Sequence, residues 1–238
     1  MNTMDKIIVF DIWADYAHIK KPYTTTSPIT YSIPTRTVIT GILGAMLGIP
    51  KNKNNIVLSS DICSISLRII NPIKKVMVAQ NLIDTKTAKY YMARMKQRTQ
   101  IRFEYLKESK YRIYVILKDD ELYRELRDKL VGHESYYTIS VGLSENLANF
   151  AYIGEYDYEM IRQETEIDSV INLDKVNEED IVFEGDKEYF TERIAIDMLE
   201  DREVTKFSDV LFERNGKKIK IRDIEYYELE NQERVVFM

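Results

Sequence analysis

A segment bracketed by prolines constrains the fold of this 238-residue chain more than any other feature. Pro34 precedes it, and Gly48 and Pro50 follow a run in which apolar residues recur at helical spacing. Proline is favoured in the first turn of a helix, and glycine followed by proline is typical of a helix end. The pattern therefore predicts one helix that begins at Thr35 and ends before Gly48.

Three glycines fall on one side of this expected helix: Gly41, Gly44 and Gly48. Glycine destabilises a helix interior by about 1 kcal/mol relative to alanine. We therefore expect another part of the structure to pack very closely against this side.

The remaining periodic segments place this helix in a mixed fold. Strands are expected where β-branched and aromatic residues concentrate or alternate with polar ones. A second helix is expected at 119–130, where acidic residues open an apolar stripe and basic residues close it. In chain order the sequence predicts a strand at 6–14, the first helix, strands at 64–70 and 111–117, the second helix and a strand at 137–141. This β-α-β-β-α-β order is typical of a ferredoxin-like α+β core, which we assign to residues 1–154.

Charge is divided sharply along the chain. Residues 1–118 hold 19 Lys and Arg against 7 Asp and Glu, a net of +12, whereas residues 119–238 hold 15 against 32, a net of -17. Such a division indicates that one part of the surface attracts polyanions and the other repels them. We expect residues 155–238 to form an acidic, mostly β module with a hairpin at 209–221, because Asn215-Gly216 is a strong hairpin-turn signal.

The segment at 74–110 concentrates the positive charge. It holds ten Lys and Arg against three acidic residues, and its ends at 76–78 and 101–105 are typical of strands. We interpret it as a long basic β-hairpin inserted in the core. Cations suit phosphates and exposed rings suit unstacked bases, so this composition favours RNA.

Metal, redox and phosphate-loop chemistry lack their usual residues. The one cysteine is Cys63, and the two histidines, His18 and His133, lie far apart in the sequence. No zinc ligand set, disulfide, phosphate-binding glycine loop or nucleophile elbow is expected. The sequence therefore predicts no cofactor and no metal. With no signal peptide and no apolar run that could span a bilayer, we expect a cytoplasmic protein without a membrane partner.

Two kinds of RNA chemistry remain open. Metal-independent cleavage needs only a general base and a general acid, which Tyr16, His18, Lys20 and Lys21 could supply. A lone histidine near a strand end is more often structural, so binding without catalysis is favoured. Free N–H groups at the start of the first helix would add an anion site. The predicted RNA-binding residues are Lys20, Lys21, Tyr23, Arg36, Thr37, Lys74, Lys75, Tyr90, Tyr91, Arg94, Lys96, Arg98 and Arg102.

Three stretches together resemble a known family. They are VFDIWADYAHI at 9–19, YSIPTRT at 31–37 and TGILGAMLG at 40–48. They resemble the CRISPR-associated protein five family, a branch of the RAMP superfamily found in type I Cascade complexes, and are closest to type I-B. Weaker similarity at 140–145, 192–194 and 202–204 leaves residues 155–188 unmatched.

The resemblance implies a specific role. Members of this family have a ferredoxin-like core, a protruding hairpin thumb and a C-terminal extension. They cap the 5′ handle of the crRNA and contact the backbone subunit and the large subunit of the complex. They meet target DNA only indirectly, through that complex.

One branch of the family is an endoribonuclease that uses a tyrosine with an adjacent Lys-His pair. Here Ala17 precedes His18 and Gly132 precedes His133, so the pair is absent. The resemblance thus implies the non-catalytic form. The alternatives are a metal-independent endoribonuclease that processes CRISPR repeat RNA, and an interaction module that binds no RNA of its own.

Overall fold

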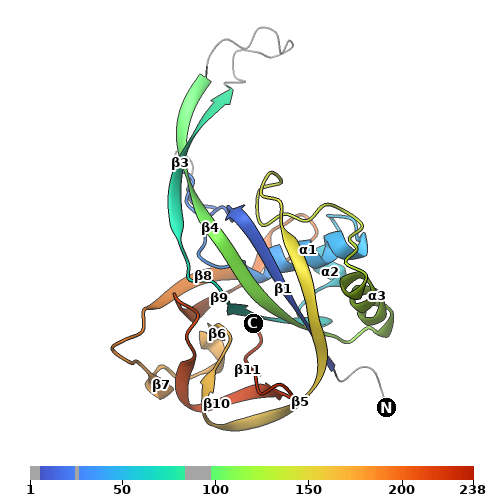
Figure 1. Ribbon diagram of the computed structural model, residues 1–238, viewed down its shortest axis with the longest axis vertical. Coiled ribbons are helices and arrows are strands. Elements are labelled where there is room, and N and C mark those ends of the chain that lie inside the picture. Colours follow the sequence, from blue (N-terminus) through green and yellow to red (C-terminus); the bar gives the residue numbers. More distant parts are fainter. Residues whose placement is uncertain (1–5, 25–26, 84–97) are drawn as a thin grey trace.

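The computed structural model describes residues 6–24, 27–83 and 98–238, which form a mixed structure of mostly sheet with few helices (Figure 1). The helices are α1 (Arg36–Leu47), α2 (Asn54–Val57) and α3 (Asp120–Val131). The strands are β1 (Lys6–Ala17), β2 (Cys63–Ile69), β3 (Lys75–Ile83), β4 (Arg98–Leu117), β5 (Asn149–Ile167), β6 (Ile171–Asn172), β7 (Ile181–Val182), β8 (Tyr189–Met198), β9 (Val204–Glu213), β10 (Ile219–Leu229) and β11 (Arg234–Val235). Two short 3-10 turns, η3 (Leu173–Lys175) and η4 (Glu178–Asp180), complete the described elements.

The larger of two sheets runs in the order β11-β10-β5-β1-β4-β2, with β3 beside β4 and β7 beside β10. β1 lies between β5 and β4 and pairs antiparallel with both. β2 pairs antiparallel with the other edge of β4. The smaller sheet has the order β6-β9-β8. The strands predicted at 6–14, 64–70 and 111–117 therefore all lie in the larger sheet.

Both faces of β1 are buried over residues 7–12, which explains why its first half is almost continuously apolar, whereas Asp15 and Tyr16 near its end are exposed. Ile8 and Phe10 pack in the main core with side chains of α1 and α3. Ile7 and Val9 face the other way and pack with residues near the C-terminus, among them Phe237. A strand covered on both faces has no position at which a polar side chain reaches water.

Both predicted helices are present. Thr35 caps α1 by accepting a hydrogen bond from the N–H of Val38 at 3.3 Å, and Gly48 ends it with φ of 70°. Gly41 and Gly44 face Asn54, at the start of α2, and Gly48 faces the ring of Tyr136. A Cβ built on Gly44 would lie 3.0 Å from the Asn54 Cβ, so glycine is what permits this approach.

The prediction of a strand at 137–141 is wrong. These residues belong to a loop between α3 and β5 that carries only isolated bridges, Ser140 with Leu147 and His18 with Gly142. Ile139 and Val141 alternate because both anchor the loop in the core. The strand that pairs with β1 is β5, which begins at Asn149.

The hairpin predicted at 209–221 is also wrong. Residues 214–216 do turn, with Gly216 at φ of 76°, but β9 and β10 lie in different sheets and do not pair. The Glu213 carboxylate accepts hydrogen bonds from the N–H groups of Asn215 and Lys217, both at 2.8 Å. These bonds hold the turn open as a link between two sheets.

The division expected between residues 154 and 155 falls inside β5. The first part of this strand pairs with β1 and the second part with β10. Residues from beyond this point, including Ile194, Val210 and Phe212, pack in the main core. The acidic half is mostly β, as its sequence predicts, and it shares its core with the first half.

No helix in the described ranges is long and apolar enough to cross a membrane. Among the same residues, no group of three or more His, Cys, Asp or Glu is placed to hold a metal ion. Cys63 is a free, buried thiol, and burial raises its pKa to about 12.

Candidate nucleic-acid interface

The basic arm is a two-stranded hairpin that projects from the sheet (Figure 1). β3 pairs with the first part of β4, from Lys75 opposite Leu106 to Ile83 opposite Arg98. The rest of β4 is a central strand between β1 and β2. Because one continuous strand forms both the arm and the core, the sheet sets the direction of the arm.

One face of the described strands of the arm carries two free cations. Arg98 and Arg102 are four residues apart on β4, so their side chains share a face, and both are exposed. Neither forms an ion pair with another residue in the described part of the chain. The opposite face is more apolar: Val78, with 37% of its surface exposed, lies opposite Phe103.

His18 lies at the base of the arm and is structural. It is 1% exposed, its Nδ1 is 2.7 Å from the Glu104 carbonyl oxygen, and its ring lies 5.5 Å from those of Phe103 and Tyr105. The base of the arm therefore covers the imidazole. Of the other residues named for acid–base chemistry, Tyr16 is 44% exposed, and Lys20 is also exposed.

Three predicted cations form ion pairs within the protein: Lys21 with Glu192 at 2.9 Å, Lys74 with Glu108 at 3.0 Å and Lys75 with Glu104 at 3.2 Å. The Lys74 pair is exposed, and such pairs contribute about 0–1 kcal/mol, so a phosphate can replace the carboxylate. Lys21 is more firmly held. Burial opposes its charge, but the contact with Glu192 outweighs burial and raises the pKa of Lys21.

The loop after β1 presents two other predicted residues to solvent. Lys20 is exposed, and Tyr23 is 70% exposed. Both remain in the candidate interface. Four further predicted residues, Tyr90, Tyr91, Arg94 and Lys96, lie outside the described residues.

Arg36 departs from its predicted role as an anion site. It is 1% exposed, and its guanidinium donates to the carbonyl oxygens of Ile196, Leu58 and Cys63 at 2.6 to 3.0 Å. It also forms an ion pair with Asp197 at 3.0 Å. Burial lowers the pKa of Arg36, and these acceptors compensate for its charge. The Arg36 side chain joins α1 to the segments around it and is not available to RNA.

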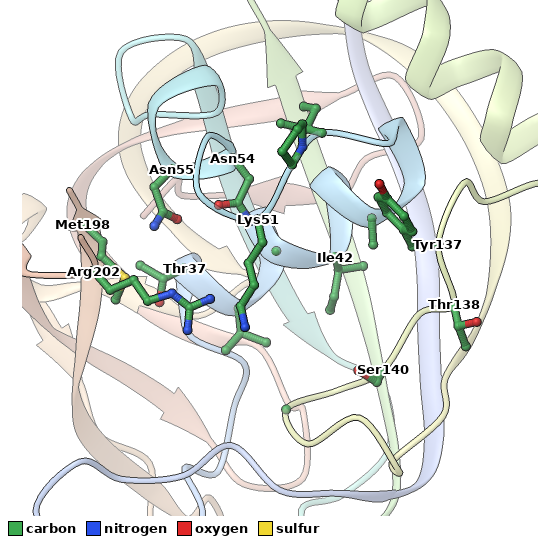
Figure 2. Close-up of a pocket in the computed structure, with 16 residues that line it drawn as sticks. Thr37, Ile42, Lys51, Asn54, Asn55, Tyr137, Thr138, Ser140, Met198 and Arg202 are labelled. Atoms are coloured by element: carbon green, nitrogen blue, oxygen red, sulfur yellow. The ribbon is translucent and has the colours of Figure 1, made fainter. Parts of the chain in front are cut away.

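A pocket of about 820 Å³ opens beside α1 (Figure 2). Thr37, the other residue predicted at the helix start, lines it, together with the segment after α1, the loop between α3 and β5, and the turn between β8 and β9. Its polar and charged lining includes Lys51, Asn54, Tyr137 and Arg202. Sequence reasoning missed these residues because they come from three separate segments, none of which is a motif by itself.

The fold resembles that of a solved CRISPR protein. A CRISPR protein from Archaeoglobus fulgidus is 12% identical, with 98% of each chain covered and a TM-score of 0.59. A chain of a CRISPR RNA-guided surveillance complex is 9% identical over 95% of this chain and 92% of that one, with a TM-score of 0.48. At these identities the first likeness shows the fold alone, and the second carries no argument. No curated protein matches the sequence.

The family is shown by the sequence itself. The family model for CRISPR-associated protein (Cas_Cas5) matches residues 7–214, most of the chain. The chain belongs to this CRISPR-associated Cas5 family. The resemblance seen at 9–48 is thereby confirmed at the level of the family.

Proposed function

We propose that this protein is a non-catalytic crRNA-binding subunit of a type I CRISPR Cascade complex, which caps the 5′ handle of the crRNA. In this proposal it contacts the backbone and large subunits and meets target DNA only through the complex. The type I-B assignment remains a prediction of the sequence. The observation that carries the proposal is the basic arm. It projects from the sheet and presents Arg98 and Arg102 to solvent without a carboxylate partner among the described residues.

The topology supports the same proposal. The order β5-β1-β4-β2, antiparallel throughout, with α1 between β1 and β2 and α3 between β4 and β5, is what a ferredoxin-like core requires. The arm would then be an insertion between the second and third core strands. The chain from β6 onward would be the C-terminal extension.

The arrangement around His18 favours binding over cleavage. The imidazole is buried and surrounded by Phe103 and Tyr105. A general base must come within hydrogen-bond reach of the proton that it removes. The ribonuclease alternative would need the base of the arm to open.

The test is a gel-shift of labelled repeat RNA in EDTA, run beside a denaturing gel of the same samples. The proposal expects a shift that depends on the handle sequence, with intact RNA. The variant Arg98→Glu with Arg102→Glu should bind more weakly. Its plot of log affinity against log salt concentration should be less steep by about 1.4, because each lost phosphate contact removes about 0.7 from the steepness.

A matched control makes the same charge change elsewhere. Lys206 and Arg222 are exposed residues of the acidic half, and the variant Lys206→Glu with Arg222→Glu should keep the wild-type salt slope. Equal slopes for the two double variants would refute the arm as the interface. A cleaved product that disappears with His18→Ala would instead establish the ribonuclease.

A further inference from the structure

The pocket beside α1 combines two unpaired cations, a ring and a buried amide in one cavity. We propose that it holds a single unstacked nucleotide of the bound RNA, with the phosphate at Lys51 and Arg202 and the base at Asn54 and Tyr137. This inference rests on the proposed function, because it assigns a nucleotide subsite to an RNA-binding protein. The volume, about 820 Å³, lies within the roughly 300–1,000 Å³ of small-ligand sites and is too small for a duplex.

The phosphate side of the pocket is defined by two cations that converge. Lys51 follows α1 and Arg202 lies in the turn between β8 and β9, and Figure 2 shows their charged ends pointing toward each other. Both are exposed, and neither has an ion pair with a carboxylate in the described ranges. Two like charges brought together without a counter-ion favour an anion between them.

Arg202 adds an observation of backbone geometry. Its φ is 70°, in the left-handed region that a non-glycine residue rarely adopts and that costs on the order of 1 kcal/mol or more. Glycine would fit this turn without strain. Backbone stability therefore does not explain the arginine at this position, and its side chain is suited to binding an anion.

The base side of the pocket is defined by an amide. Asn54 is only 9% exposed and its Oδ1 has no hydrogen-bond partner among the described residues. A buried acceptor left unpaired costs about 1–3 kcal/mol. Asn54 lines the pocket, but its Oδ1 is covered from solvent, so a nucleobase N–H donates to it once the amide turns toward the pocket.

The glycines of α1 place this amide. Gly41 and Gly44 have no side chain to keep Asn54 away from the helix, and a Cβ on Gly41 would lie 3.8 Å from the Asn54 Nδ2. Across the pocket, the backbone N–H of Tyr137 donates to the Ala45 carbonyl oxygen at 2.9 Å. The Tyr137 ring is 50% exposed, and an exposed ring is a stacking surface for an unstacked base.

A neighbouring groove limits how the RNA can enter. It adjoins the pocket at Asn55 and Met198, and its lining includes Asp61, Glu200 and Asp201. These carboxylates repel a phosphate backbone. The nucleotide therefore reaches the pocket from the side of the loop at 137–142, and the strand does not continue through the groove.

The experiment measures the binding of repeat RNA in which one base at a time is replaced by fluorescent 2-aminopurine. With the wild-type chain, quenching should occur at one position that is not quenched in Asn54→Leu. Leucine has a similar volume and lacks the unpaired amide, so folding should be preserved. Arg202→Gly should bind the same RNA about tenfold more weakly, the effect of losing one charge-assisted contact, while its melting temperature stays equal or rises.

A matched control separates the effect on RNA affinity from the stability gained by removing a strained, left-handed non-glycine residue. Gln232 also has a left-handed backbone, with φ of 67°, and Gln232→Gly should raise stability without changing affinity. Wild-type affinity and quenching in both Asn54→Leu and Arg202→Gly would overturn the pocket proposal and leave the proposed function standing. A wild-type chain that binds no repeat RNA would overturn the proposed function and the nucleotide site with it.

Discussion

Arg36 offers the sharpest test of how this fold is held together. The variant Arg36→Ala removes the donor for three carbonyl oxygens, from Ile196, Leu58 and Cys63, and the partner of Asp197. Leu58 directly follows α2 and Cys63 begins β2, whereas Ile196 and Asp197 lie at the end of β8, so one side chain joins α1 to a nearby segment and to a distant strand. We expect a large loss of stability and no specific loss of RNA binding.

The magnitude follows from the groups left unpaired. Each buried carbonyl without a donor costs about 1–3 kcal/mol, and removing one partner of a buried ion pair costs about 3–5 kcal/mol. These effects share one guanidinium and are not additive. Asp197 also keeps its hydrogen bonds from Ser60, which limits the cost. The expected loss is about 3–5 kcal/mol, a large part of the roughly 5–15 kcal/mol of a typical domain.

Trp13, the single tryptophan of the chain, lies on β1 and reports unfolding. A urea titration followed by its fluorescence gives the stability of each variant from the midpoint and slope. Arg124→Ala is the control, because Arg124 is 59% exposed and its pair with Asp120 is 3.8 Å long; it should cost less than about 1 kcal/mol. A loss below about 1 kcal/mol for Arg36→Ala, or weakened RNA binding at unchanged stability, would refute this reasoning and return Arg36 to the interface.

Two further predictions concern turns. Gly142→Ala should destabilise the fold by more than about 2 kcal/mol in the same titration, because a left-handed alanine costs about 1–2 kcal/mol and its Cβ would lie 1.9 Å from the His18 carbonyl oxygen; Gly185→Ala, with no atom within 4 Å of its Cβ, is the control, and equal losses would contradict the prediction. Burial opposes the charge of Glu213, but backbone N–H donors outweigh burial and lower its pKa. A lowered pKa stabilises the fold above the ordinary value of about 4.5 and loses this effect as the pH falls. Glu213→Gln should therefore be less stable than wild type at pH 7 and approach it below about pH 4, and a difference independent of pH would count against the assignment.

The acidic half has a structural role beyond its charge. Its residues complete the main core, and Glu192 and Asp197 hold Lys21 and Arg36 of the first half. Ion pairs between the two halves thus neutralise part of the positive charge of the first half and part of the negative charge of the second. Among the cations that pair with no described carboxylate are Arg98 and Arg102 of the arm and Lys51 and Arg202 of the pocket.

Local signals in the sequence were sufficient to predict the helices and strands that depend on residues close together in the chain. The proline, the capping Thr35 and Gly48 define α1, and Asp119 caps α3 as its acidic first turn predicts. The strand ends of the arm followed from β-branched and aromatic residues, and the family followed from 9–48. Each of these depends on neighbours within a few residues, so spacing alone carries the information.

Tertiary structure decided what those signals could not. The same alternation that predicts a strand at 137–141 also fits a loop with two buried anchors, and Asn215-Gly216 makes a turn whether or not the flanking strands pair. Arg36 was predicted to bind an anion because a helix start favours anions. In the fold it is buried, and its guanidinium donates to carbonyl oxygens of other segments. The pocket unites Lys51, Asn54, Tyr137 and Arg202 only through the packing of three segments. Contacts between residues far apart in the chain leave no periodic pattern in the sequence, and so only the folded structure could reveal them.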